Sequence, residues 1–203
     1  MSSFFTAVVF WAILKWDHVA DEPLADRWLI FIAYMMGLSI GVHLLNLVTI
    51  PAMAYVYYFR RYDYSIKGMI YTFLISLVIL GVSQVGVISG RPAVADAFEI
   101  IFVNSMGMPF NSGILFFVAI FLGGLVYGIY YTQKQAKVIA NLALICFSFI
   151  LIGYASYGII LIRSNFNPPI DENDPENAIT FVSYLKREQY GDRPLLYGPQ
   201  FNA

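Results

Sequence analysis

Long runs without charged residues dominate this chain. Four stretches contain no Asp, Glu, Lys or Arg: residues 28–59, 68–90, 100–133 and 138–162. They are 32, 23, 34 and 25 residues long, and about 20 apolar residues in a helix suffice to cross the hydrocarbon core of a bilayer. Each run is therefore long enough for at least one membrane-spanning helix.

Turn signals divide two of these runs. Gly41 and Pro51 fall inside the first, which predicts two short helices, 27–41 and 45–59, joined by a turn at 42–44. Pro109 and Gly113 leave a span at about 112–131 in the third. An apolar run at 3–14 is too short to cross and lacks the features of a signal peptide, so it is interpreted as the second half of a truncated helix.

Basic residues set the expected orientation. They occur in three connections, one with Lys15 and Arg27, one with Arg60, Arg61 and Lys67, and one with Lys134 and Lys137. The positive-inside rule places all three connections in the cytoplasm. The turn at 42–44, the loop at 90–111 and the tail after residue 163 then face the outside.

Two outward segments have patterns of their own. Val94, Phe98 and Phe102 share a helical face, which predicts an amphipathic helix at about 93–106 lying in the membrane interface. Asp96 and Glu99 are spaced like a capping box at its start. In the tail, Asp174 and Pro175 are typical of a helix start, and residues 195–197 suggest a short strand.

These elements define an all-α integral membrane protein with about six transmembrane helices, the first truncated, an interfacial helix and a short soluble tail. The predicted domains are a multi-pass domain at 1–163 and a tail at 164–203, interpreted as the start of a truncated soluble region. Composition agrees, since 59% of the residues are hydrophobic and 12% are charged, against about 25% charged in soluble domains. A net charge of −1 indicates no nucleic-acid partner.

The candidate chemistry is a set of outward-facing polar residues. No zinc spacing, P-loop, nucleophile elbow or dinucleotide motif is present, and no metal or cofactor is predicted. His43 and Asn46 can serve either helix packing or substrate contact. Arg91 and Arg163 can extend to lipid headgroups or hold a phosphate. In the tail, Lys186, Arg187, Glu188 and Arg193 form either a solvated face or part of a site.

Four motifs resemble a known family. They are residues 37–46 (GLSIGVHLLN), 109–113 (PFNSG), 163–169 (RSNFNPP) and 184–198 (YLKREQYGDRPLLYG). Together they are similar to the bacterial membrane family labelled DUF2723, and the likeness runs along the whole chain. That family in turn resembles protein O-mannosyltransferases of the GT-C type.

The resemblance implies a glycosyltransferase of the bacterial inner membrane. Such an enzyme transfers a sugar, with mannose as one candidate, from a polyprenyl-phosphate donor to Ser or Thr of an acceptor protein on the periplasmic side. It implies donor or acceptor contacts for six residues: His43, Asn46, Arg91, Arg163, Glu188 and Arg193. The family's acidic Trp-Asp-x-Gly-Glu motif, where the catalytic base is expected, is absent from this sequence. The chain is therefore interpreted as an internal fragment that is inactive alone.

Two other function classes remain open at this point. A transporter or channel subunit suits the broken helix near Gly41, although such carriers usually have carboxylates within their spans. A non-catalytic scaffold of the cell envelope needs no outward polar cluster. It would tolerate substitutions at His43 and Arg193, which would distinguish it from the glycosyltransferase.

Overall fold

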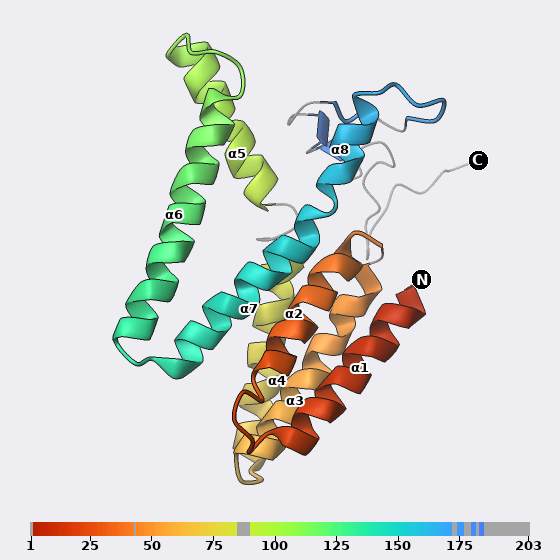
Figure 1. The fold of residues 1–203 in the computed structure, drawn as a ribbon, viewed down its shortest axis with the longest axis vertical. Coiled ribbons are helices and arrows are strands. Elements are labelled where there is room, and N and C mark those ends of the chain that lie inside the picture. The colour runs from red at the N-terminus through yellow and green to blue at the C-terminus, as the bar shows by residue number, and fades with distance from the viewer. Residues whose placement is uncertain are drawn as a thin grey trace, which may run out of the picture.

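The computed structural model describes residues 2–42, 44–84, 90–171, 174–176, 180–181 and 183–184, without the side chains of residues 44, 45 and 91–93. Its elements are all helical, as predicted (Figure 1). In chain order they are α1 (Ser2–Val19), α2 (Arg27–Ile40), the 3₁₀ helix η1 (Leu44–Thr49), α3 (Ile50–Arg61), α4 (Ile66–Gly81), α5 (Arg91–Ile100), the π-helical turn η3 (Ile101–Ser105), α6 (Ser112–Lys134), α7 (Val138–Ala155) and α8 (Gly158–Ser164).

Within the described residues, three helical stretches are long and apolar enough to cross a membrane: Ile66–Gln84, Ser112–Lys134 and Val138–Ser164. The shorter apolar helix α2 and the pair η1–α3 follow the predicted split of the first long run, with Pro51 in the first turn of α3. α1 reaches Val19 and is therefore longer than the predicted run at 3–14. The chain is thus an α-helical membrane protein.

The core lies mainly between α1, α2, η1 and the start of α3, and α7 packs closely on α2. A Cβ added to Gly153 would lie 2.5 Å from the carbonyl oxygen of Tyr34, and one added to Gly37 would lie 2.2 Å from that of Ile150. The two backbones therefore touch, as small residues allow in membrane helix pairs. α1 covers the other side of α2 and buries Trp16 and Ile13 in the same core.

α5 and α6 form a separate hairpin, and Figure 1 shows α5 running alongside the upper part of α6. Phe98 and Phe102 of the predicted amphipathic face contact Phe116 of α6 at ring-centroid distances of 5.9 and 5.0 Å, whereas Val94 is exposed. The placement of this helix in the membrane interface stays a prediction.

The predicted capping box is wrong. α5 begins at Arg91, so Asp96 and Glu99 lie inside the helix and not at its start. The Glu99 carboxylate instead accepts hydrogen bonds from the backbone N–H groups of Asn111, Gly113 and Ile114. It therefore caps α6, whose free N–H groups and positive dipole end attract a carboxylate.

Two further boundaries differ from the sequence expectation. The last span bends at Ser156 and Tyr157, which separate α7 from α8, and the Ser156 hydroxyl donates to the Gly153 carbonyl over 2.7 Å. In the tail, residues 174–176 have no regular structure. The predicted helix start at Asp174 and Pro175 is therefore wrong. The strand predicted at 195–197 lies outside the described residues.

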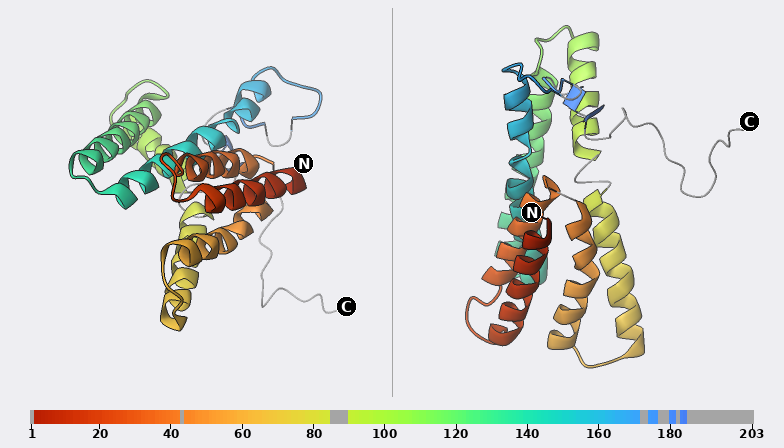
Figure 2. Two further views of the ribbon diagram at one scale, coloured as in Figure 1. Left: turned by 60° about the horizontal axis from the view of Figure 1, so that its bottom comes forward. Right: turned by 90° about the vertical axis from the view of Figure 1, so that its right-hand side faces the viewer.

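The three connections that carry basic residues lie toward one end of the molecule. Figure 1 shows the α1–α2, α3–α4 and α6–α7 connections at the lower end, and Figure 2 shows the first two there from a second side. The α5–α6 loop and the end of α8 lie toward the other end, and the α2–η1 turn lies near mid-height, at the upper ends of α2 and α3 (Figure 1). This arrangement agrees with the predicted alternation of the loops, and the side of the membrane that each end faces stays a prediction.

Candidate functional site

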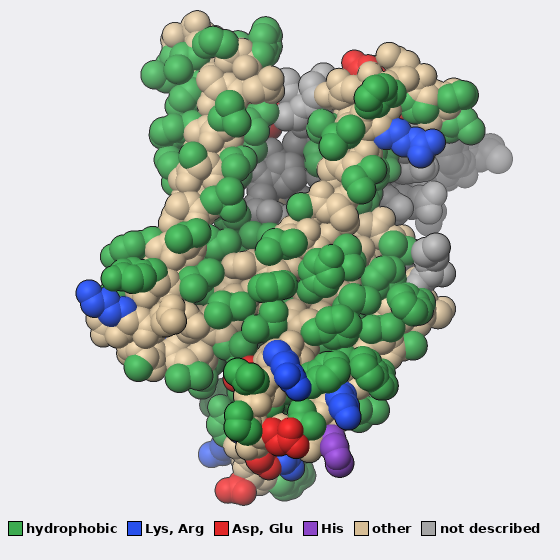
Figure 3. Space-filling model, in the orientation of Figure 1, with side chains coloured by type: hydrophobic (Ala, Val, Ile, Leu, Met, Phe, Trp, Pro, Cys, Tyr) green, Lys and Arg blue, Asp and Glu red, His purple; other side chains and the backbone are tan. Residues whose placement is uncertain are grey.

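An apolar cleft separates the α5–α6 hairpin from α7 and α8. It has a volume of about 690 Å³. Figure 3 shows the hollow in the upper half of the molecule, with hydrophobic side chains on both of its sides. The cleft exists because α6 contacts α7 near their shared connection and diverges from it toward the upper end (Figure 1).

The cleft wall is almost entirely hydrocarbon. Its lining includes Phe117, Phe121 and Val126 of α6, Leu151 and Ala155 of α7, and Leu161 of α8. The Ser148 hydroxyl is a polar group in the wall, and it donates a 2.8 Å hydrogen bond to the carbonyl of Leu144. The described part of this wall provides no charged partner for a hydrophilic ligand and suits a hydrocarbon or isoprenoid chain.

Aromatic side chains gather at the upper end of the cleft. Tyr154 lines the cleft and stacks on Tyr157 at a centroid distance of 5.8 Å. Phe181 of the tail also lines the cleft and lies 6.3 Å from the Tyr157 ring. The Tyr157 ring further packs on Gly41, where an added Cβ would lie 3.0 Å from its Cδ2 atom. Contacts of the Tyr157 ring thus bring together the end of α2, the bend before α8 and part of the tail.

Arg163 is the basic residue in the last turn of α8, two positions after Leu161 of the cleft wall. Its side chain is exposed. In the described part of the chain this side chain makes no ion pair or hydrogen bond with another residue. A guanidinium with free donors is well shaped to bind a phosphate through two parallel hydrogen bonds.

Asn46 has a packing role and lies away from the cleft. It is 1% exposed, its amide donates to the Ser39 hydroxyl over 2.9 Å, and its side-chain oxygen accepts from the Thr6 hydroxyl over 3.1 Å. The residue therefore ties η1 to α1 and α2. Of the two interpretations left open by the sequence, the structure supports the helix-to-helix hydrogen bond.

The remaining candidates cannot be placed. His43, Glu188 and Arg193 lie outside the described residues, as does the side chain of Arg91. Among the described candidates, Asn46 and Arg163 do not meet. Within the same residues, no group of three or more His, Cys, Asp or Glu side chains is arranged to hold a metal ion.

The sequence did not reveal the cleft or its aromatic end. Apolar side chains that face a cleft and those that face lipid have the same pattern along a helix, so periodicity cannot separate them. The cleft depends on the angle between α6 and α7, which no local motif encodes. The nearness of Tyr157 to Gly41 likewise follows from the crossing of α2 and α7.

Comparison with known proteins finds a family match to the first part of the chain. The family model described as the N-terminal domain of the protein O-mannosyl-transferase TMEM260 matches residues 1–66, which cover α1, α2, η1 and α3. No curated protein and no solved structure matches the chain. The first third of the chain is therefore similar to an O-mannosyltransferase-like domain.

Proposed function

We propose that this chain is part of a membrane glycosyltransferase that transfers mannose from a polyprenyl-phosphate donor to Ser or Thr of an acceptor protein. The observation that carries the proposal is the match of residues 1–66 to the O-mannosyltransferase domain. The resemblance of four motifs to the bacterial family DUF2723 supports the same reaction class, and it favours an inner-membrane protein whose tail is periplasmic.

The cleft supports a lipid-linked donor. Its apolar wall matches a polyprenyl chain. On entering the cleft, such a chain exchanges the hydrocarbon of the bilayer for hydrocarbon side chains, so no polar group loses its hydration. Arg163 lies two residues from the wall residue Leu161, at the end of the last span. In this proposal the cleft holds the chain and the Arg163 guanidinium binds the phosphate. His43, Arg91, Glu188 and Arg193 complete the donor and acceptor contacts.

In this proposal the chain binds the donor but does not supply the catalytic base. A base must accept the proton of the acceptor hydroxyl as the new glycosidic bond forms. The acidic motif that the resemblance associates with this step does not occur in the sequence. We therefore expect no sugar transfer from a polyprenyl-phosphate donor to a Ser/Thr peptide by this chain alone.

Donor binding tests the proposal directly. The chain in lipid nanodiscs is irradiated with a photoactivatable polyprenyl-phosphate mannose, and excess unlabelled donor or phosphatidylglycerol is added as competitor. We expect the donor to compete and phosphatidylglycerol not to. Ser148→Trp, which fills the cleft, abolishes labelling, whereas Leu77→Trp on the exposed face of α4 does not. Equal labelling of both variants would contradict the cleft assignment.

The phosphate contact has its own variants. A hydrogen bond to a charged group contributes about 1.5–3 kcal/mol, so Arg163→Ala is expected to lower donor affinity roughly tenfold to a hundredfold. Arg163→Lys keeps the charge but loses the paired donors, and is expected to recover part of the affinity. Wild-type affinity in Arg163→Ala would show that Arg163 is only a surface anchor. Transfer by the chain alone would show that it contains the base.

A further inference from the structure

The α3–α4 hairpin packs on the core through Met53, Val56 and Tyr57 of α3 and Leu80 of α4, and it has polar attachments at its two ends. α4 packs chiefly on α3, and α3 meets the other helices through η1 above and through α1. Figure 2 shows α3 and α4 standing apart from α1 as a pair. The attachments at the two ends differ in chemistry.

At the upper end, η1 is held by buried hydrogen bonds. Asn46 joins Thr6 and Ser39, and the Thr49 hydroxyl donates to the Asn46 carbonyl over 2.7 Å. Ser39 and Asn46 are each 1% exposed, so water does not compete for these bonds. The backbone here is 3₁₀, a geometry with poorer hydrogen bonds that often marks a hinge between helical segments.

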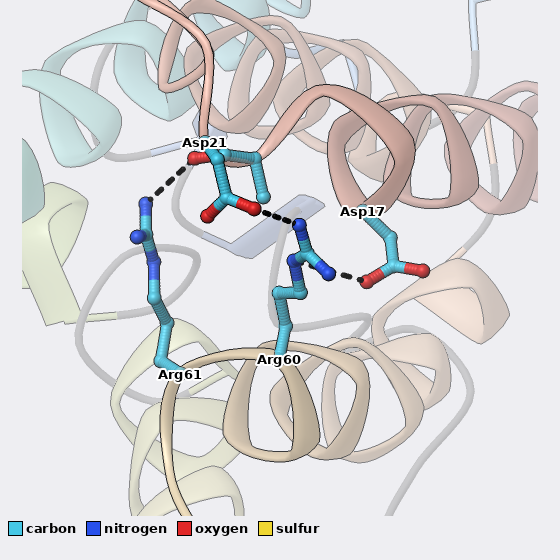
Figure 4. Close-up of polar contacts among 5 residues, drawn as sticks. Asp17, Asp21, Arg60 and Arg61 are labelled. Carbon is cyan, nitrogen blue, oxygen red and sulfur yellow. Dashed lines mark hydrogen bonds and ion pairs between the residues drawn. The ribbon is translucent and has the colours of Figure 1, made fainter.

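At the lower end, charged groups join the last turns of α1 and α3 (Figure 4). Arg60 donates to the Asp21 carboxylate, and its Nε lies 3.9 Å from Oδ1 of Asp17. Arg61 donates to the carbonyl of Ala20 over 3.1 Å, and its guanidinium lies 5.8 Å from the ring centroid of Trp16. We name these contacts of Arg60 and Arg61 with α1 the lower clasp.

The lower clasp is weak for its number of contacts. The side chains of Arg60, Asp17 and Asp21 are 34%, 46% and 78% exposed, so water and salt screen their attraction. Behind them, Trp16 is fully buried and stacks on Tyr57, yet its indole N–H has no acceptor among the described residues. A buried unsatisfied donor disfavours the closed arrangement. The contacts of Arg60 and Arg61 must therefore offset the cost of burying the Trp16 indole N–H.

We propose that the α3–α4 hairpin pivots at η1 and that the lower clasp holds it closed against α1. Loss or screening of the charges on Arg60 and Arg61 then lets the lower ends of α1 and α3 separate, which gives water access to the Trp16 indole N–H. The buried bonds of Asn46 keep the upper ends together during this motion. This device is independent of the reaction proposed above.

Electron–electron distance measurements on spin labels test the device in the full chain in nanodiscs. Cys146 is first replaced by Ala, and labels are placed at Glu22→Cys and Asp63→Cys across the lower end. At about 50 mM salt we expect one short distance, with any longer population at most about a tenth. At about 1 M salt, and in the variant R60Q/R61Q at either salt, the longer population rises to at least about half.

Three controls make the result decisive. K67Q removes a charge near the clasp but not in it, and is expected to leave the distances unchanged. Labels at Phe4→Cys and Val48→Cys, both exposed beside the pivot, are expected to keep one distance throughout. The exchange Asp21→Arg with Arg60→Asp restores the pairing and the single short distance, which separates loss of the clasp from misfolding. Identical distributions in wild type, R60Q/R61Q and K67Q would overturn the proposal.

Discussion

Glu99 and Asp96 lie about one turn apart on α5 in opposite surroundings. Glu99 is 7% exposed and accepts three backbone N–H groups at the start of α6. Oδ1 of Asp96 is also shielded from water but has no hydrogen-bond partner within the described parts of the chain. One carboxylate therefore joins the α5–α6 hairpin, while the other carries a desolvation cost without an evident return in stability.

The two acids are expected to respond oppositely to loss of charge. Glu99→Gln weakens three charge-assisted bonds and is expected to lower the free energy of unfolding by about 2 kcal/mol. Asp96→Asn has nearly the same shape and removes the charge of a carboxylate whose Oδ1 has no hydrogen-bond partner in the described part of the chain, so stability is expected to stay equal or rise. SDS-induced unfolding followed by near-UV circular dichroism measures both. Equal destabilisation by the two variants would show that Glu99 does not cap α6.

At individual residues, the sequence indicates chemical type better than role. Asn46 was a candidate for substrate contact or packing, and only its neighbours Thr6 and Ser39 decide for packing. They are 40 and 7 positions away in the chain, so no local pattern contains this information. The role of Glu99 was missed for the same reason, because the N–H groups that it binds follow 12 to 15 positions later.

Among the elements, the crossing of α2 and α7 brings two helix backbones into direct contact. Gly37 lies against the backbone of α7 and Gly153 lies against the backbone of α2, and neither position leaves room for a Cβ atom. Gly124 of α6 is the opposite case, since an added Cβ there meets nothing within 4 Å. The two glycines therefore make a matched pair in which the same substitution has different consequences.

Gly153→Ala is expected to destabilise the protein by about 1–3 kcal/mol, because its methyl group forces the backbones of α2 and α7 apart. Gly124→Ala adds a methyl group in open space and is expected to be neutral or to stabilise by up to about 1 kcal/mol, since alanine favours the helix. The measurement is the same unfolding titration. A harmless Gly153→Ala would mean that the two helices do not touch at this point.

The sequence predicts which segments are helical more reliably than how they end. Charge-free runs and Gly or Pro positions predicted α2, α3, α4, α6 and the last span, because the length of an apolar run and the breaking residues are local properties. The bend at Ser156 and Tyr157 was missed, since neither residue prevents a helix from continuing. The packing of Trp16 in α1 against α3 was not predicted, because this contact depends on how the two helices are arranged in space and not on a local pattern.

For the whole molecule, the distribution of charge agrees with the arrangement of the loops. Nine Lys and Arg residues occur up to position 184, and seven of them belong to the three connections at one end. Arg163 lies at the end of α8, toward the other end, and Arg91 opens α5, whose start lies nearer the middle of the molecule (Figure 1). Arginine and lysine are retained on the cytoplasmic side of membranes, so this asymmetry favours a cytoplasmic lower end and an outer cleft mouth.

The orientation can be measured with reporters that are active on one side of the membrane only. Fusions after Gln135 in the α6–α7 connection and after Tyr64 in the α3–α4 connection are expected to report the cytoplasm, because both connections carry lysine or arginine. Fusions after Met108 in the α5–α6 loop and after Asn173 in the tail are expected to report the outside. Gln135 and Asn173 in the same compartment would refute the scheme, since the helical stretch from Val138 to Ser164 separates them. Tyr64 opposite to Gln135 would instead show that the chain from α4 to α6 does not return to the side of the membrane on which α4 begins.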